Sequence, residues 1–294
     1  MGSVYLRVLR GLNRPECLPV QSIIIRLNQM EHGKDVSVEM LSSIGLTITP
    51  IPEANSKRAD LHGLDPKGGN YIIEAKDKDD VKLSPKQIER LKEGEVVSDA
   101  QRTNQNNTIS GIFDDAAAQL EATPCSEPTF RLIWIFADGH DYQLICDRAF
   151  ATFYGHVYLF DMASSDTKQN DLTRCFYFDY NSAYRLTSVD GLILCDRTGM
   201  QLLANEFSKS FSDFKASYLY SKFADQSVCT DPTMSEASGE SISFRSSIPR
   251  GDDKRTISEI EKQTGTKYTP IRFTRYSSSI LTPPPKLDAS DDDG

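Results

Sequence analysis

Two carboxylates and one lysine are the side chains of this sequence whose types and spacing could do chemistry together. Asp60 lies in the stretch RADL (58–61), and Glu74 and Lys76 lie in the stretch YIIEAK (71–76). Carboxylate oxygens are the ligands that Mg²⁺ prefers in proteins. An ammonium group beside such a cation could orient or deprotonate a water molecule, or stabilise the charge on a phosphate.

A β-hairpin would bring these three side chains together. The run DPKGGN (65–70) between the two stretches is a strong turn signal, so that 71–76 is predicted to be the second strand of a hairpin. Because side chains alternate along a strand, Glu74 and Lys76 project from one face, and Asp60 would return beside Glu74. His62 faces the same side as Asp60 and could assist the metal or the leaving group; a hydrogen-bonded structural histidine is the alternative reading.

The elements around this hairpin follow from hydrophobic periodicity and capping residues. They are, in order, a helix over 36–44, a helix that begins at the capping box of Ser84 and Gln87, a polar loop over 98–108, a helix over 112–120 and a buried strand over 130–137. The order of helix, hairpin, helices and central strand predicts an α/β sandwich.

This arrangement resembles the PD-(D/E)XK nuclease superfamily. Its motif is an Asp on one strand, followed on the next by an acidic residue, any residue and a lysine, which Asp60, Glu74 and Lys76 match. Many members carry a Glu on the helix before the hairpin, where Glu39 stands, and some carry a Gln on the helix after the motif strand, where Gln119 is a looser match. The resemblance covers roughly residues 20–140. It departs from the motif at Ala59, which stands where the name-giving Pro would be.

The resemblance implies a fold, an activity and a cofactor. The fold would be restriction-endonuclease-like, with a central mixed sheet flanked by helices. The activity would be hydrolysis of phosphodiester bonds, with DNA as the expected substrate and Mg²⁺ or Mn²⁺ as the cofactor. Asp60 and Glu74 would bind the metal, Lys76 would position or activate the attacking water, and Glu39 would support a metal-bound water or a second cation. Many nucleases of this kind cut both strands as dimers, so a homodimer is one expected assembly.

A short basic stretch follows the hairpin. Lys82, Lys86 and Arg90 are spaced by four residues, and the last two share a helical face, so they could meet phosphates beside the metal site. A solvated helix face, with Glu89 and Glu93 nearby, is the alternative interpretation.

Two rival readings of the hairpin belong to other classes. The fold could be kept without catalysis, as a module that binds nucleic acid or a protein partner, and the formal charge of −9 favours this reading. The domain could also be an unrelated α+β fold in which Glu74 and Lys76 merely pair with their neighbours.

Composition divides the chain into three regions. Residues 1–155 are expected to form the nuclease-like core, 156–224 a strand-rich accessory region packed on it, and 225–294 a mostly disordered Ser/Asp/Pro-rich tail. One island in the tail is expected to be ordered, with a capping box at Thr256, a helix stop at Gly265 and a short strand after it.

The overall composition excludes several classes of protein. Hydrophobic residues make up 38% of the 294 residues, which is enough for a core. The longest apolar run, 132–137, is far shorter than the about 20 residues that span a membrane, and the N-terminal residues, interrupted by Arg7 and Arg10, show no continuous apolar segment of the kind expected in a signal peptide. The six cysteines contain no C-x-x-C pair and predict reduced thiols, so the protein is expected to be intracellular, in the cytoplasm or nucleus.

Overall fold

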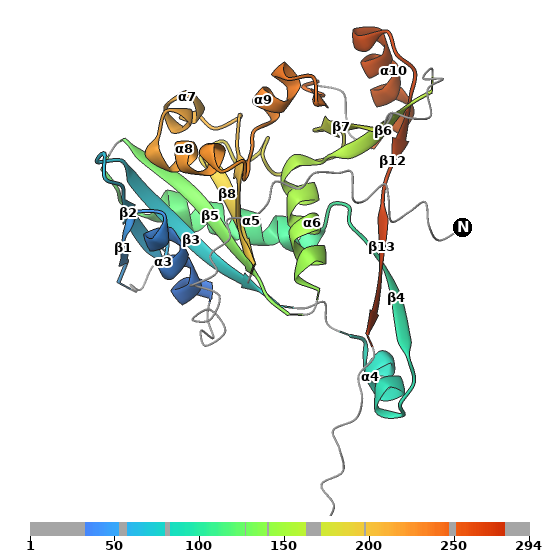
Figure 1. Cartoon of the computed structure of the whole chain (residues 1–294), viewed down its shortest axis with the longest axis horizontal. Coiled ribbons are helices and arrows are strands. Elements are labelled where there is room, and N and C mark those ends of the chain that lie inside the picture. The colour runs from blue at the N-terminus through green and yellow to red at the C-terminus, as the bar shows by residue number, and fades with distance from the viewer. Residues whose placement is uncertain are drawn as a thin grey trace, which may run out of the picture.

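The computed structural model describes residues 33–52, 58–79, 83–126, 128–139, 141–162, 172–196, 198–246 and 251–279. Its main feature is a seven-stranded mixed sheet (Figure 1). In spatial order the strands are β1 (Thr47–Pro50), β2 (Leu61–Leu64), β3 (Asn70–Lys78), β5 (Thr129–Ala137), β8 (Gly191–Asp196), β9 (Gly199–Ala204) and β10 (Cys229–Thr230).

This sheet combines antiparallel and parallel strand pairs. The predicted hairpin is present as β2 and β3, with Leu61 opposite Ile73, and β1 extends it on the outer side. The strands β3, β5 and β8 run parallel; β5 and β8 are almost completely buried, and β3 is buried over residues 71–74. Continuous apolar sequence suits strands that are covered on both faces, which is why FRLIWIFA forms the centre of the sheet.

Helices cover both faces of the sheet, as the α/β prediction required (Figure 1). On one face, apolar side chains of α3 (Gly33–Ser43), α7 (Phe211–Lys215) and α8 (Tyr218–Asp225) pack with Tyr71 and Trp134. On the other face, α5 (Asn107–Ala122) and α6 (Tyr142–Tyr154) pack with Ile72 and Ile133. The two cores place the hairpin between α3 and α5.

The expected boundary at residue 155 is wrong, because the main sheet crosses it. Strand β8 pairs in parallel with β5, and β9 continues the same sheet. The sequence GLILCD is buried along its whole length, so it belongs in a sheet centre and not in a peripheral layer.

A second, four-stranded sheet holds two strands of the 156–224 region and two strands from beyond it. Its order is β11 (Ser241–Ser243), β7 (Leu172–Phe176), β6 (Val157–Asp161) and β12 (Tyr268–Ile271). Helix α10 (Asp253–Thr264) packs on one face, where Ile260 and Phe244 are buried with Leu159.

The expectation of a mostly disordered tail is also wrong for the part of it that the structure describes. Strands β10, β11, β12 and β13 (Thr274–Ser279) and helices α9 (Pro232–Ala237) and α10 all lie beyond residue 225. The predicted stop at Gly265 is confirmed, with φ of 74°, but the helix is capped by Asp252 and not by Thr256. Residues 280–294 lie outside the described residues.

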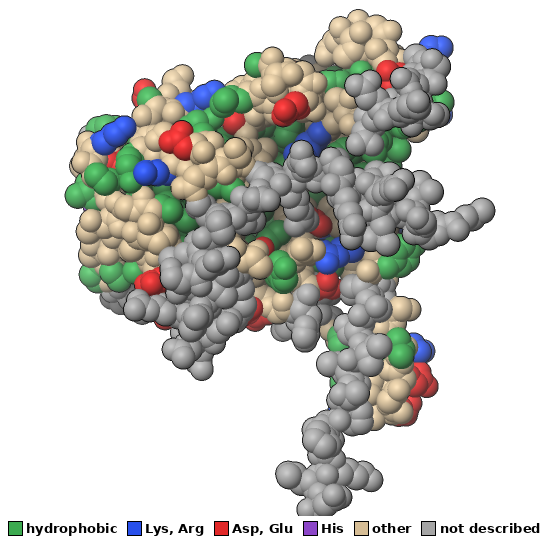
Figure 2. Space-filling model, in the orientation of Figure 1, with side chains coloured by type: hydrophobic (Ala, Val, Ile, Leu, Met, Phe, Trp, Pro, Cys, Tyr) green, Lys and Arg blue, Asp and Glu red, His purple; other side chains and the backbone are tan. Residues whose placement is uncertain are grey.

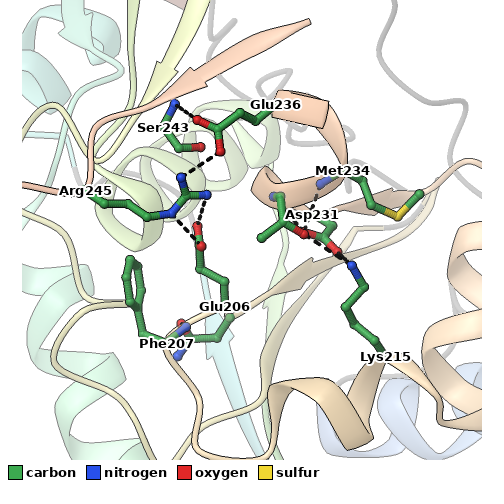
Figure 3. Close-up of polar contacts among 10 residues, drawn as sticks. Glu206, Phe207, Lys215, Asp231, Met234, Glu236, Ser243 and Arg245 are labelled. Atoms are coloured by element: carbon green, nitrogen blue, oxygen red, sulfur yellow. Dashed lines mark hydrogen bonds and ion pairs between the residues drawn. The ribbon is translucent and has the colours of Figure 1, made fainter. Parts of the chain in front are cut away.

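Charged side chains attach this C-terminal segment to the main sheet (Figure 3). Arg245 donates to Glu206 at 2.7 Å and to Glu236 at 2.6 Å. Lys215 lies 3.0 Å from Asp231, the N-cap of α9. Buried apolar residues and these pairs together explain why a sequence rich in Ser and Asp is ordered.

A projecting arm consists of α4 (Pro85–Lys92), β4 (Val97–Arg102) and β13 (Figure 1). Ser84 and Gln87 form the predicted capping box of α4. The polar stretch 98–108 was expected to be a loop, but its first part is β4, which pairs with β13 in antiparallel register, Arg102 opposite Thr274. Because the partner of β4 is not a neighbouring segment of the sequence, the local sequence pattern did not predict this strand.

Candidate active site

Asp60 lies beside Glu74 at the point where the pairing of β2 with β3 ends. Leu61 pairs with Ile73, and the amide of Asp60 also donates to the carbonyl of Ile73 at 3.2 Å, so that Asp60 and Leu61 together face Ile73, as at a β-bulge. The Asp60 carboxylate accepts from the amide of Ala75, and it is close enough to Glu74 to raise the pKa of that carboxyl group. Lys76 follows Glu74 by two residues on the same face of β3, and its ammonium donates to Glu74. We call Asp60, Glu74 and Lys76 the carboxylate site.

Asp60 is held by contacts on both of its oxygens. Oδ2 accepts a hydrogen bond from the amide of Ala75 at 3.0 Å, and Oδ1 lies 3.2 Å from the ammonium of Lys34 on α3. The Asp60 side chain is 27% exposed, so solvent reaches it. Sequence reasoning missed Lys34, because the helical pattern that was recognised starts two residues after it.

Glu74 is the buried member of the carboxylate site. Its side chain is 2% exposed, and its Oε1 accepts a hydrogen bond from Lys76. Its Oε2 is buried and has no hydrogen-bond partner. Burial raises the pKa of Glu74 to about 7; the hydrogen bond from Lys76 opposes this rise, and the neighbouring carboxylate of Asp60 adds to it.

The start of α3 is fixed against the end of β3. The amide of Gly33 donates to Oδ2 of Asp77 at 3.0 Å, so this carboxylate satisfies one of the free N–H groups of the first turn. A Cβ atom on Gly33 would lie 1.7 Å from Asp77 Oδ1, so the contact needs glycine. This close approach puts the next residue, Lys34, within reach of Asp60.

The end of α5 supports the other side of the hairpin. The hydroxyl of Thr123 accepts from the amide of Ala59 at 2.7 Å and donates to the carbonyl of Gln119 at 2.7 Å. The amide side chain of Gln119 donates to Asp115 O, one turn back in its own helix, at 3.3 Å. Gln119 thus reaches the hairpin through its backbone carbonyl, and its side chain is engaged within α5.

Two other predicted residues, His62 and Glu39, lie on β2 and on α3. His62 is half-buried on β2, opposite Ile72 and on the face of Asp60. Glu39 is half-buried on α3, but at 100° per residue it is turned about 140° away from Lys34, which is the residue that contacts Asp60.

The predicted basic stretch is separated from the carboxylate site. Lys86 and Arg90 are exposed on α4, at the tip of the projecting arm, and Arg90 pairs with Glu95 at 2.6 Å (Figure 1). Lys82 lies outside the described residues. On the face drawn in Figure 2, the Lys and Arg side chains of the described segments are scattered, with acidic ones between them.

The carboxylate site is suited to a hard divalent cation that keeps water among its ligands, and less suited to a metal ion that is held by protein ligands alone. Within the described ranges, no three His, Cys, Asp or Glu side chains are grouped so as to hold a metal ion. Mg²⁺ is commonly bound by one or two carboxylates, with water and substrate phosphate oxygens as its other ligands. Asp60 and Glu74, the latter with an unpartnered oxygen, match that pattern.

Comparison of the chain with protein-family models, with curated proteins and with solved structures found no match. None of the helices in the described part of the chain combines the length and the apolar character that crossing a bilayer requires.

Proposed function

We propose that this protein is a metal-dependent nuclease of the PD-(D/E)XK type that hydrolyses phosphodiester bonds, with DNA as the expected substrate. The observation that carries the proposal is the juxtaposition of Asp60 and Glu74 on neighbouring strands, with Lys76 on the same face. Isolated charged triplets are common on strands, but this one includes a buried carboxylate with an unpartnered oxygen. Such an atom is costly to bury unless something binds it.

The order of the surrounding elements supports the finer fold assignment. Helix α3, the antiparallel strands β1 to β3, helix α5 and strand β5 parallel to β3 follow one another as the resemblance implies. The helices α3 and α5 cover opposite faces of these strands. The two elements of the arm that lie between β3 and α5 in the sequence, α4 and β4, form an insertion that leaves this order intact.

The carboxylate site contains two metal ligands and one lysine in the proposed reaction. A divalent cation held by Asp60 and Glu74 would supply Lewis acidity toward the scissile phosphate. Lys76 would orient the attacking water and stabilise the negative charge that develops on the phosphate oxygens. Lys34 would hold Asp60 in its rotamer, because its ammonium and the Ala75 amide fix both carboxylate oxygens.

A cleavage assay tests this proposal. Supercoiled plasmid, linear duplex, single-stranded DNA and RNA would be incubated with Mg²⁺, Mn²⁺ or EDTA. We expect cutting that needs the metal and that falls at least a hundredfold in Asp60→Asn and Lys76→Met. Lys262→Met, on the distant helix α10, is the matched control and should cut like the wild type, because this lysine is 72% exposed. Metal-dependent cutting that survives in Asp60→Asn would contradict the assignment of the site.

A second candidate function is a nuclease-fold module that binds a partner without cutting it. It is favoured by the lysine contacts, because Lys34 and Lys76 already neutralise the two carboxylates. The chain's charge of −9, and the scattered basic residues on the face drawn in Figure 2, also favour the module that does not cut. Calorimetric titration with Mn²⁺ separates the candidates: the nuclease binds Mn²⁺ and loses it in Asp60→Asn, whereas a folded protein that neither binds Mn²⁺ nor cuts is the binding module.

A further inference from the structure

Four buried polar atoms without hydrogen-bond partners lie on one face of the four-stranded sheet. They are Nδ1 of His156, Nε of Arg174 and the hydroxyl oxygens of Ser241 and Ser243. The structure describes all four residues, and they belong to segments far apart in the sequence. We call this side of the four-stranded sheet the arginine face.

Strand register shows that these residues share a face. Ser241 lies beside Arg174, and Ser243 lies beside Phe176, two residues further along β11 and β7. Tyr158 lies opposite Arg174, and Val157 lies opposite Cys175, which places His156 opposite Phe176. Paired residues, and residues two apart on one strand, point to the same side of a sheet.

The opposite face of this sheet has a different character. Val157, Leu159 and Cys175 are buried there in an apolar cluster with Ile260 of α10. The unpartnered polar atoms are therefore confined to one side, and they are not spread through the small sheet at random.

Arg174 has no carboxylate partner among the described residues. Its guanidinium lies over the rings of Phe150, Tyr158 and Phe176, at 5.2, 5.6 and 5.8 Å from their centroids, and Nη2 donates to the Tyr158 hydroxyl at 3.1 Å. By contrast, Arg245 and Arg272 each contact two carboxylates. The described protein thus leaves the charge of Arg174 unbalanced, which is costly away from water.

His156 adds a neutral group to this positive charge. Its ring lies edge-on to Phe150 and Tyr158, with centroids 4.8 and 5.7 Å away. Burial, reinforced by the charge of Arg174, lowers the pKa of His156 to about 3, so the imidazole is neutral near pH 7. A neutral imidazole can carry its proton on Nδ1 and donate it, as the two serine hydroxyls can.

We propose that the arginine face binds a phosphate-type oxyanion. Arg174 would supply the charge and the Nε–H donor, and Ser241 would donate from the adjacent strand, about 5 Å away in the hydrogen-bonding direction. A third donor would come from the next row of residues, either Ser243 or His156, which lie on opposite sides of Phe176. A tetrahedral oxyanion has several acceptor oxygens and can bind a charged donor and neutral donors at once. The inference is independent of the proposed nuclease, since it involves no residue of the carboxylate site.

Titration with inorganic phosphate tests the proposal. The full chain would be titrated calorimetrically with sodium phosphate at constant ionic strength, in EDTA so that no metal contributes, and its thermal unfolding would be compared in phosphate and in chloride. We expect phosphate to bind and to raise the unfolding midpoint, because a ligand that binds only the folded state stabilises it. In Arg174→Met, which keeps a long apolar stem against the rings, the affinity should fall at least tenfold.

Matched variants make the outcome decisive. Arg185→Met removes an arginine that is already paired with Asp114, and it should bind phosphate like the wild type. Ser241→Ala should weaken phosphate binding, and it provides the test if Arg174→Met does not fold. Equal behaviour of the wild type in phosphate and chloride would overturn the proposal, as would unchanged phosphate affinity in Arg174→Met or in Ser241→Ala.

Discussion

At the scale of single residues, Glu74 combines burial with a titration near neutral pH. Its pKa is about 7 in the folded protein, against an ordinary value of 4.5. Between these values the folded state binds more protons than the unfolded state, so the free energy of unfolding falls as pH rises from about 4.5 to about 7. The shift corresponds to about 3 kcal/mol in total.

The substitution Glu74→Gln should remove this part of the pH dependence. Urea unfolding at several pH values between 4.5 and 8 would measure it, as the difference in slope between the variant and the wild type. Glu95→Gln, at a side chain that is 51% exposed, is the control and should keep the wild-type slope. Parallel curves for Glu74→Gln and the wild type would show that Glu74 does not titrate in this range.

Lys34 offers a second test at this scale. Its ammonium competes with any cation for Asp60, so Lys34→Met should strengthen Mn²⁺ binding. The side chains of the pair are 36% and 27% exposed, and solvent-screened pairs contribute about 0.2–1 kcal/mol, so the gain in Mn²⁺ affinity should be about 1.4-fold to fivefold. Calorimetric titration with Mn²⁺ would measure it, with Lys262→Met as the control. Unchanged or weaker Mn²⁺ binding in Lys34→Met would contradict this competition.

At the scale of elements, the contact between α3 and β3 depends on a missing side chain. A Cβ on Gly33 would collide with Asp77, so Gly33→Ala should lower the free energy of unfolding by about 1–3 kcal/mol. Gly111, within α5, has nothing within 4 Å of such a Cβ, so Gly111→Ala should stabilise by about 0.5–1 kcal/mol. Chemical denaturation of the two variants measures both effects. Equal stability changes would mean that the first turn of α3 moves freely against β3.

The elements that sequence analysis predicted are those with local signals. The helix over 36–44, the hairpin, the capping box of Ser84 and the strand over 130–137 each depend on residues within a few positions of one another, and all are present. The juxtaposition of Asp60 and Glu74 was predictable for the same reason, since one short turn determines it.

The elements that were missed depend on distant partners. Strand β4 is polar, and β13, its partner, comes about 170 residues later, as the bond from Thr103 to the Phe273 carbonyl shows. The place of β8 in the main sheet is determined by pairing with β5, across a helix and a second sheet. The contact of Lys34 with Asp60 likewise arises from the packing of α3, which periodicity alone does not orient to that precision.

At the scale of the whole molecule, the arm depends on the C-terminal strand. A chain that ends at Arg272 lacks β13, and an isolated strand or ribbon is marginal in water. We expect β4 amides to lose protection against hydrogen exchange by at least a hundredfold, while β5 and β8 keep theirs, because all their partners lie before residue 205. A chain that ends at Ser279 retains β13 and is the control. Undiminished protection of β4 in the shorter chain would mean that α4 alone is enough to support it.

The pairing of β4 with β13 has a consequence for the protein while it is being made. The ribosome adds roughly 5–20 residues per second, so β4 emerges about 10–30 s before its partner has been synthesised. During that interval its backbone groups have no strand to pair with, and an unpaired edge is a template for other chains. The polar sequence VSDAQR is poor in the residues that drive β-aggregation, so we expect β4 to remain unpaired until β13 is available, without pairing with another nascent chain on the same polysome.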